Sequence, residues 1–415
     1  MKTTFKQSFI FCLVLIVFIA CEKSDPVQDE PGKLILRKKS AEIIKVNQDF
    51  AFELFREVYS LSSKENIMIS PLSVSYALGM TYNGAAGTTK EAFKNVLHFG
   101  ELTDQEVNES YQDLMDQLIH LDKQVQFSIA NSIWYKMGFQ VLQEFITTNK
   151  TYFDAAVREL DFYDPASVDI INGWIEDKTN DKIKDMLDQI PSNALMYLIN
   201  AIYFNAKWKY EFDKTQTQAG TFYLDDGTST QAEFMKVTGN FNYRATADFT
   251  AIELPYGDST FSMLVLLPEG GKKVSGLVSM MDTSDYSTWT GSLKPAGLQI
   301  MLPKFKYSYG GVNELLNDPL ISLGLGIAFD DLSADFSRIS TLPGLYISRV
   351  IHQTFIDVQE EGTEAAAATI VEIYEKNGNP QPLLLRIDRP FLYLIKENSS
   401  GAIMFMGKVG RPEYL

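Results

Sequence analysis

The stretch EEGTEAAAAT, residues 360–369, decides the fold of this chain, although its local composition favours a different structure. Thr363 can cap a helix, and residues 365–368 are all alanine, the residue with the highest helix propensity. Asn377-Gly378 is a typical helix end. Taken alone, the segment is therefore typical of a helix.

The same residues also form a regular strand pattern. Read with a period of two, one face carries only small side chains, those of Thr363, Ala365, Ala367 and Thr369. Such side chains can lie between neighbouring strands and face a packed core without overfilling it. Gly362, directly before them, offers a conformationally free hinge. We therefore expect a segment that becomes a strand.

The composition around this stretch is that of a globular protein. Of the 415 residues, 45% are hydrophobic and 22% are charged, which argues against global disorder. The formal net charge is -16, and no run of Lys or Arg forms a track for phosphates, which argues against nucleic acid as a partner. No linker follows residue 35, so we expect one domain over residues 36–415.

The first 20 residues are typical of an export signal. Lys2 and Lys6 precede an apolar run, residues 9–20, which is too short to span a bilayer. Its end, FIAC at residues 18–21, resembles the lipobox of bacterial lipoproteins, in which the Cys is acylated and becomes the mature N-terminus. We therefore predict lipidation at Cys21; the alternative is an ordinary secretory signal with an incidental Cys.

The residues after Cys21 have the composition of a tether. The sequence CEKSDPVQDEPG is polar, charged and carries two prolines, so residues 21–35 are predicted to form a flexible spacer. The only other cysteine, Cys12, lies inside the signal, so the mature chain can form no internal disulfide. Stability must then come from the core.

Hydrophobic periodicity predicts helices early in the chain and strands later. Residues 40–62 carry apolar side chains every three or four positions, and a second helix is expected after Pro71, capped by Ser70. Residues 261–267 alternate like a strand and follow a turn signal at residues 257–259. Segregated elements of this kind favour an α+β domain.

Catalytic and metal-binding motifs are absent from the sequence. The three histidines, His98, His120 and His352, have no spacing that builds a zinc site, and no nucleophile elbow, dinucleotide turn or phosphate loop occurs. We expect no metal, no cofactor and no enzyme activity. His352 with Ser70 or Ser73 is the one candidate catalytic pair, and buried polar groups that bond one another are the simpler interpretation.

Several motifs now resemble one family, the serpins, over residues 40–412. Besides the hinge at residues 360–369, the matching stretches are NIMISPLS (66–73), NAIYF (200–204) with Trp208, ELPY (253–256), ADFS (334–337), DRPF (388–391) and FMGKV (405–409). The resemblance implies one α+β domain with three β-sheets, about eight or nine helices and an exposed reactive-centre loop at about residues 360–382.

The resemblance also implies a mechanism. Serpins are suicide substrates: a protease cuts the loop, the loop inserts into a sheet, and the protease is trapped as an acyl-enzyme. The hinge that would insert first comprises Glu360, Glu361, Gly362, Thr363, Glu364, Ala365, Ala366, Ala367, Ala368 and Thr369. Its small, uncharged inserting face favours an inhibitory member of the family.

Two further groups of residues match structural sites of the family. The shutter, a polar cluster under the opening sheet, comprises Ser70, Ser73, Asn200 and His352. The breach, where the loop enters, comprises Trp208, Lys304 and Glu360, and we expect Lys304 and Glu360 to pair. The family assignment thus absorbs the supposed catalytic Ser/His pair.

The loop length that the resemblance implies, 17 residues counted from Glu360, predicts the scissile bond between Lys376 and Asn377, which suits trypsin-like proteases with a carboxylate in the primary pocket. Counting back from RPF at residues 389–391 instead points nearer Asn379. Tyr374 would suit a chymotrypsin-like enzyme, and Ile373 or Val371 an elastase-like one. Subtilisin-like and papain-like proteases also remain open as targets.

Three functions follow for testing. The first is a monomeric protease inhibitor, anchored to a bacterial envelope at the outer membrane or cell surface. The second is a binding protein that keeps the serpin fold without trapping proteases. The third is a hydrolase that uses Ser70 and His352.

Overall fold

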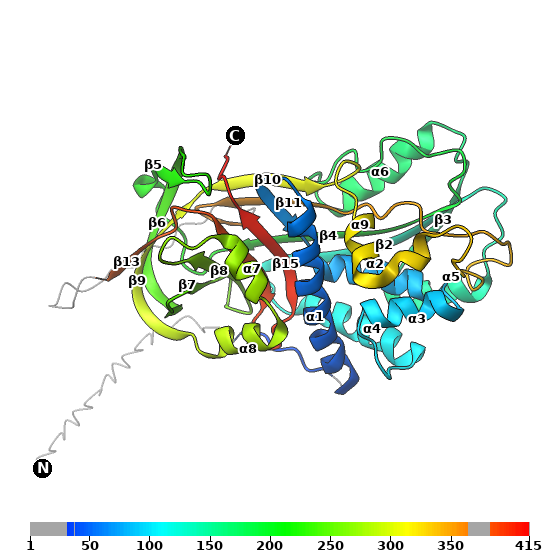
Figure 1. The fold of residues 1–415 in the computed structure, drawn as a ribbon, viewed down its shortest axis with the longest axis horizontal. Helices are drawn as coiled ribbons and strands as arrows, with labels where there is room; N and C mark the ends of the chain where they lie inside the picture. Colours follow the sequence, from blue (N-terminus) through cyan, green and yellow to red (C-terminus); the bar gives the residue numbers. More distant parts are fainter. Residues whose placement is uncertain (1–30, 37, 364–381, 415) are drawn as a thin grey trace, which may run out of the picture. The chain divides into compact units, whose positions relative to one another are not determined.

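The computed structural model describes residues 31–36, 38–363 and 382–414 of the chain. Within these residues nine α-helices cover two β-sheets, which confirms the α+β class and the expected number of helices (Figure 1). The helices are α1 (Lys38–Leu61), α2 (Pro71–Tyr82), α3 (Gly87–Val96), α4 (Asp104–His120), α5 (Gln143–Phe153), α6 (Ala166–Lys178), α7 (Val274–Met280), α8 (Thr283–Gly291) and α9 (Asn317–Leu320), with short helical turns at Lys214–Gln216, Ile321–Leu325 and Gly326–Phe329.

The two helices predicted from periodicity and capping are both present. In α1 the apolar residues Ile43, Phe50 and Leu54 are completely buried, so the periodic face is the face that packs on the core. In α2 the Ser70 side chain accepts a hydrogen bond from the Ser73 amide, with Pro71 at the first helical position. Capping and periodicity therefore predict the start of both helices to within two residues.

The six-stranded sheet carries the hinge. Its strand order is β10 (Phe305–Gly310), β11 (Gln353–Gln359), β12 (Gly362–Thr363), β4 (Met196–Lys207), β2 (Val125–Lys136) and β3 (Ala156–Leu160). Neighbouring strands are antiparallel except β2 and β3, which are parallel. The hinge strand β12 therefore lies between two strands that are far from each other in sequence.

The nine-stranded sheet forms the rest of the scaffold. Its order is β1 (Asn66–Ile69), β15 (Ile403–Val409), β14 (Phe391–Glu397), β8 (Phe261–Pro268), β7 (Phe249–Pro255), β6 (Ser229–Ala245), β9 (Lys294–Pro303) and β13 (Leu383–Arg386), with β5 (Gln218–Tyr223) also paired to β6. The strand expected at residues 261–267 is thus confirmed as β8, although it is buried on both faces rather than one.

A separate third sheet is not found among the described strands, and the length of β6 explains why. β6 has 17 residues: one edge pairs with β5 at its start and with β7 at its end. β9 runs along the other edge. A single continuous strand therefore joins what the family resemblance predicts to be two sheets.

Helices cover both faces of the six-stranded sheet. Trp134 and Ile199 pack with Ile171 of α6 in one hydrophobic cluster, whereas Ile133 and Ile202, which point the other way, belong to the main core. Figure 1 shows α6 on one side of these strands and α2 and α4 on the other. The alternation along β2 and β4 therefore separates a small α6 cluster from the main core.

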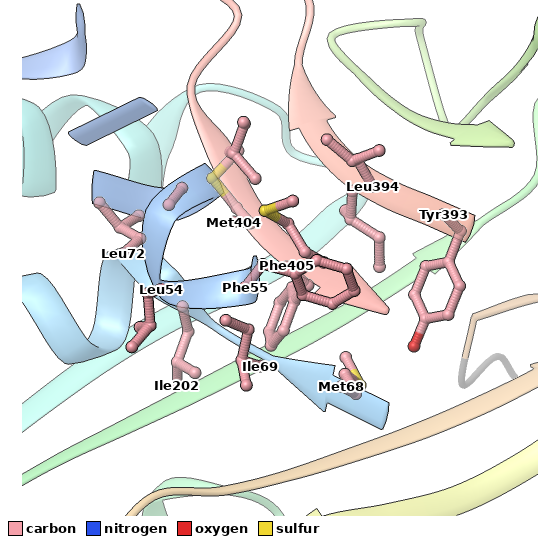
Figure 2. Close-up of a cluster of buried hydrophobic side chains, with 14 of the residues drawn as sticks. Leu54, Phe55, Met68, Ile69, Leu72, Ile202, Tyr393, Leu394, Met404 and Phe405 are labelled. Carbon is pink, nitrogen blue, oxygen red and sulfur yellow. The ribbon is translucent and has the colours of Figure 1, made fainter. Parts of the chain in front are cut away.

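The main core lies where the two sheets meet. Figure 2 shows side chains from α1, α2, β1, β4, β14 and β15 packed together, among them Phe55, Ile69 and Phe405. Ile69 is fully buried and the other two are 1% and 3% exposed. Truncation of such side chains to alanine typically destabilises a protein by about 2–5 kcal/mol.

The first described residues lie against the domain. The Gly32 amide donates to Thr260 Oγ1 (2.7 Å), and the Ile35 amide donates to Gln117 Oε1 (2.8 Å). The last part of the predicted 21–35 tether is therefore hydrogen-bonded to the domain, because its backbone finds side-chain acceptors there. Cys21 and the predicted signal lie outside the described residues. No helix in the described ranges is long and apolar enough to cross a membrane.

Candidate functional site

The hinge enters the six-stranded sheet as a strand, not as a helix. Gly362 lies opposite Gln359 of β11 and Lys207 of β4, and Thr363 lies opposite Val358 and Ala206. Only these two residues pair within the described part of the hinge, because Glu364, Ala365, Ala366, Ala367, Ala368 and Thr369 lie outside the described residues. The strand expectation therefore holds where the structure describes it.

Gly362 is required here by space. A Cβ at this position would lie 2.1 Å from the Ala206 carbonyl oxygen and 2.8 Å from Lys207 Cα, both of which are backbone atoms that cannot move aside. Its φ is not in the left-handed region that favours glycine. The sequence predicted that this glycine provides conformational freedom, but the structure shows that glycine is needed because two strands approach closely.

Thr363 points inward onto a stack of aromatic side chains. Its Oγ1 lies 2.6 Å from the Tyr256 hydroxyl, and the Tyr256 ring stacks on Trp208 with centroids 4.4 Å apart. The indole of Trp208 donates to the Gln359 carbonyl (2.9 Å), one residue before the acidic start of the hinge. Trp208 therefore ties the end of β4 to the end of β11.

Two buried acids hold the start of the hinge. Glu360 Oε2 lies 3.0 Å from Lys304 Nζ, and Glu360 Oε1 accepts a hydrogen bond from Thr217 (2.7 Å). Burial alone would raise the pKa of the Glu360 carboxyl, but these hydrogen bonds outweigh burial and hold the pKa below its usual value. Glu361 pairs with Lys214. The structure thus brings Lys304 and Glu360 together with Trp208 at the loop entry.

The predicted shutter residues form two linked pairs under the sheet. The Ser70 amide donates to His352 Nε2 (2.9 Å), and the Ser73 hydroxyl donates to Asn200 Oδ1. The Asn200 side-chain amide in turn donates a hydrogen bond to Asn131 Oδ1 on β2 (2.6 Å). The four predicted residues therefore connect α2 to β4 and to the segment before β11.

The geometry of His352 does not suit catalysis. Its Nε2 accepts a backbone hydrogen bond, while the Ser70 hydroxyl donates to the Met404 carbonyl (2.7 Å) instead of the imidazole. Burial lowers the pKa of His352 to about 4, so the ring is neutral at physiological pH. No activated nucleophile results from this arrangement.

The sheet is open beyond the hinge strand. No described strand pairing joins β11 directly to β4, and in the sheet only the two-residue strand β12 lies between them. A cavity of about 210 Å³ lies between residues 196–200 of β4 and residues 344–352, with Ser73 and His352 in its wall. An unpaired edge of β4 therefore faces a space that is open to a further strand.

Comparison with known proteins decides the family. The family model described as Serpin (serine protease inhibitor) matches residues 45–412. The chain is a serpin. An uncharacterized serpin-like protein from Methanosarcina acetivorans is 37% identical to it over 376 residues, which cover 89% of this chain and 87% of the relative.

Solved serpin structures have the same fold. The thermophilic serpin tengpin in its native state aligns with a TM-score of 0.82 at 31% identity, covering 93% of this chain and 98% of that one. Human thyroxine-binding globulin complexed with thyroxine aligns with a TM-score of 0.81 at 27% identity, covering 91% and 100%. Serpins are inhibitors and suicide substrates rather than catalysts, but the second neighbour was solved with a small molecule bound.

Several residues of the serpin site were not found from the sequence. Asn131 extends the shutter, Tyr256 contacts the hinge, Thr217 bonds Glu360, and the ring of Tyr414 covers Lys304. Tyr256 belongs to the matching ELPY motif, which was the one available signal. The others have no periodicity or spacing that marks them.

The remaining predicted residues are not tested by the structure. Lys376, Asn377, Tyr374 and Ile373 lie outside the described residues, as does Cys21. Over the described ranges no three His, Cys, Asp or Glu residues gather as a metal site would require. The roles assigned to hinge, shutter and breach stay predictions.

Proposed function

We propose that this serpin is an inhibitor that traps serine proteases as acyl-enzymes after its loop is cut and inserted. The observation that carries the proposal is the two-residue strand Gly362–Thr363, which lies between β11 and β4 at one end of an open gap. A strand that has begun to form, with a cavity further along the same gap, supports a loop that enters the sheet from this end.

The register of β12 supports a defined length of insertion. Thr363 lies opposite Ala206, so each further loop residue would lie opposite the preceding residue of β4. In this register Ile373 would lie opposite Met196, where β4 begins. Lys376 follows just beyond, so a cut after Lys376 would free the whole length that β4 can accept.

The inward direction of Thr363 supports the predicted inserting face. Because side chains alternate along a strand, Ala365, Ala367 and Thr369 would also face the main core. Continued register would place Thr369 level with Asn200 on one side and His352 on the other. A small hydroxyl side chain suits that position, because its neighbours are polar.

Insertion would lower the free energy of the molecule. Each inserted residue gains backbone hydrogen bonds to its neighbours, each with a net contribution of about 0.5–1.5 kcal/mol. Inward side chains also leave water and fill the cavity. A loop that stays out of an open sheet therefore stores the energy that trapping requires.

The target class follows from the residue at the scissile bond. Lys376 supports trypsin-like targets, while Tyr374 and Ile373 keep chymotrypsin-like and elastase-like enzymes open, and subtilisin-like and papain-like proteases are further candidates. The test is incubation with trypsin, chymotrypsin, elastase, subtilisin and a cathepsin, followed by denaturing gels and mass spectrometry of the released peptide. We expect a denaturant-resistant complex with trypsin and a cut after Lys376.

A matched pair of variants separates trapping from cleavage. Thr369→Glu puts a charge on the inserting face without adding a trypsin site, so the loop should be cut at the same bond without a complex. Ala366→Glu puts the same charge on the opposite face, which Glu364 would also occupy in this register, and should retain the complex. Cleaved product alone from the unchanged protein, with every protease, would contradict the proposal.

A non-inhibitory binding protein is the second candidate. The similarity to thyroxine-binding globulin favours it, because that protein was solved with a small molecule bound. Its sign would be an unchanged melting temperature after loop cleavage. The inhibitor should instead melt at a clearly higher temperature once cut.

The location of the inhibitor is a separate proposal. The FIAC sequence supports acylation at Cys21, which would hold a monomer on the bacterial outer membrane or cell surface. Mass spectrometry of the exported protein and its release by Cys21→Ala test the anchor, and size-exclusion chromatography tests the monomer. An unmodified Cys21 in the exported protein would contradict the anchor.

A further inference from the structure

The segment after β15 reaches the start of the hinge. Asn66 holds Arg411 by accepting from its amide (3.1 Å) and donating to its carbonyl (2.7 Å). The Lys306 amide of β10 then donates to the Glu413 carbonyl (2.7 Å). These backbone contacts place Tyr414 beside the breach.

The Tyr414 ring covers the ion pair that holds the hinge. Lys304 Nζ lies 4.1 Å from the ring centroid and 3.0 Å from Glu360 Oε2. The Lys304 side chain is 16% exposed and that of Glu360 is 6% exposed, so the pair is largely shielded from water. An aromatic face over a shielded ammonium adds a cation–π attraction and keeps the ammonium in place.

The Tyr414 hydroxyl makes a second contact with the same region. It donates to Gln359 Oε1 (3.1 Å), and the Gln359 carbonyl accepts from the Trp208 indole. Burial and the nearby acids, first Asp357, raise the pKa of Tyr414 to about 12, so the hydroxyl keeps its proton at physiological pH. Ring and hydroxyl therefore hold two successive residues, Gln359 and Glu360.

We propose that Tyr414 is a positioning residue that holds Lys304 on Glu360 and so keeps β11 and β4 from parting before the loop is cut. This inference rests on the proposed function, because it concerns the control of loop insertion. Glu360 lies two positions before Gly362, where the two-residue strand between β11 and β4 begins. If its ion pair loosens, the gap opens more readily to any strand.

The test measures insertion without a protease. A synthetic peptide with the sequence of residues 364–373 is incubated with the intact protein, and its uptake is followed by native gel and by the change in tryptophan fluorescence, to which Trp208 beside the hinge contributes. Tyr414→Leu should speed uptake about fivefold or more, as expected from the loss of a shielded cation–π contact. Tyr414→Trp, which keeps an aromatic face, should restore most of the slow rate.

The chain offers a matched control. Lys136 Nζ also lies 4.1 Å from the centroid of the Tyr163 ring. Tyr163, however, is 69% exposed, and its contacts with Lys136 involve no hinge residue. Tyr163→Leu should leave peptide uptake unchanged. In a Glu360→Gln background, Tyr414→Leu should add little, because its effect passes through the ion pair.

The outcomes separate this inference from the proposed function. Equal uptake by Tyr414→Leu and Tyr163→Leu, or an undiminished effect of Tyr414→Leu in the Glu360→Gln background, would overturn the role of Tyr414. Either result leaves protease trapping to be judged by its own complex assay. Faster uptake with no trapping of any protease would support Tyr414 and remove the inhibitory function.

Discussion

Gly362 shows how one missing side chain sets the state of the sheet. Its position between Gln359 and Lys207 leaves no space for a Cβ, so the strand can start only with glycine. Glycine at this position therefore allows the start of the hinge to pair with β11 and β4, and the next residue, Thr363, points into the core.

Gly362→Ala should expel the hinge strand. The added methyl meets the Ala206 carbonyl oxygen at 2.1 Å, so β12 must leave its neighbours or push them apart. We expect at least a tenfold loss of complex formation, about 1.4 kcal/mol or more, with cleavage retained. The control is Gly297→Ala on β9, where nothing lies within 4 Å of the added Cβ. Full trapping by Gly362→Ala would contradict this view of the hinge.

His352 should make stability fall in acid. Its pKa is about 4 in the fold, below the ordinary 6.5, because it is buried. The unfolded chain takes up the proton first, so this stability is complete above pH 6.5 and disappears as the pH falls towards 4. The full difference corresponds to roughly 3 kcal/mol. Urea midpoints between pH 7.5 and 4.5 measure it.

The comparison is His352→Gln, which should lose this part of the pH dependence. The exposed His120→Gln should follow the unchanged protein. An identical acid profile for all three proteins would show that His352 does not carry the effect.

At the residue scale, sequence predicted which side chains gather but not always why. Lys304 pairs with Glu360 as expected, and Trp208 bonds the neighbouring Gln359 carbonyl, because one topology keeps these motif residues in the same region. Gly362 was assigned to flexibility, because close approach of β4 cannot be seen in a sequence. Tyr414 was missed because its partners lie about 55 and 110 positions away along the chain.

At the scale of elements, the gap between β4 and β11 is the feature with most consequence. Continued register would put Glu372 level with Arg349, on the face towards α6. Arg349 now lies 3.8 Å from Asp188, whose side chain is 51% exposed, so this pair contributes little. Insertion would offer Arg349 a less exposed partner.

Arg349→Ala should therefore weaken the cleaved form more than the uncut form. The expected additional loss in the cleaved form is about 1 kcal/mol, the size of a partly shielded ion pair. Melting curves of both forms measure it, with Arg158→Ala, on edge strand β3, as the control. Equal losses in cut and uncut protein would argue against this register.

Local pattern predicted isolated elements better than their connection. Periodicity found α1 and alternation found β8, because each signal is carried within one element. The merging of two sheets through β6 depends on partners from three distant strands, so no local pattern reports it. The short strand β12 could be predicted only because the hinge carries unusually small side chains at alternating positions.

At the scale of the whole molecule, stability should rise when the chain is cut. Cleavage alone usually weakens a fold, but under the proposed function it would release residues 364–373 to fill the gap between β4 and β11. We expect the melting temperature to rise by about 10 °C or more, since each kcal/mol shifts it by roughly 2–4 °C in a domain of 150–250 residues. Calorimetry before and after limited trypsin treatment measures the shift. A lower melting temperature would exclude insertion.

The hydrogen-bonded residues at the start of the described chain lie near one end of the path along which the cleaved loop would insert. Gly32 is fixed at Thr260, four residues from the Tyr256 that touches the hinge. A captured protease would travel along β4 from Ala206 towards Met196, a path of roughly 33 Å. The first described residues therefore lie near the end of the sheet where the hinge enters, and the proposed lipid at Cys21 would be attached eleven positions before Gly32. Trapping would then move the protease away from the end of the sheet at which Gly32 is held.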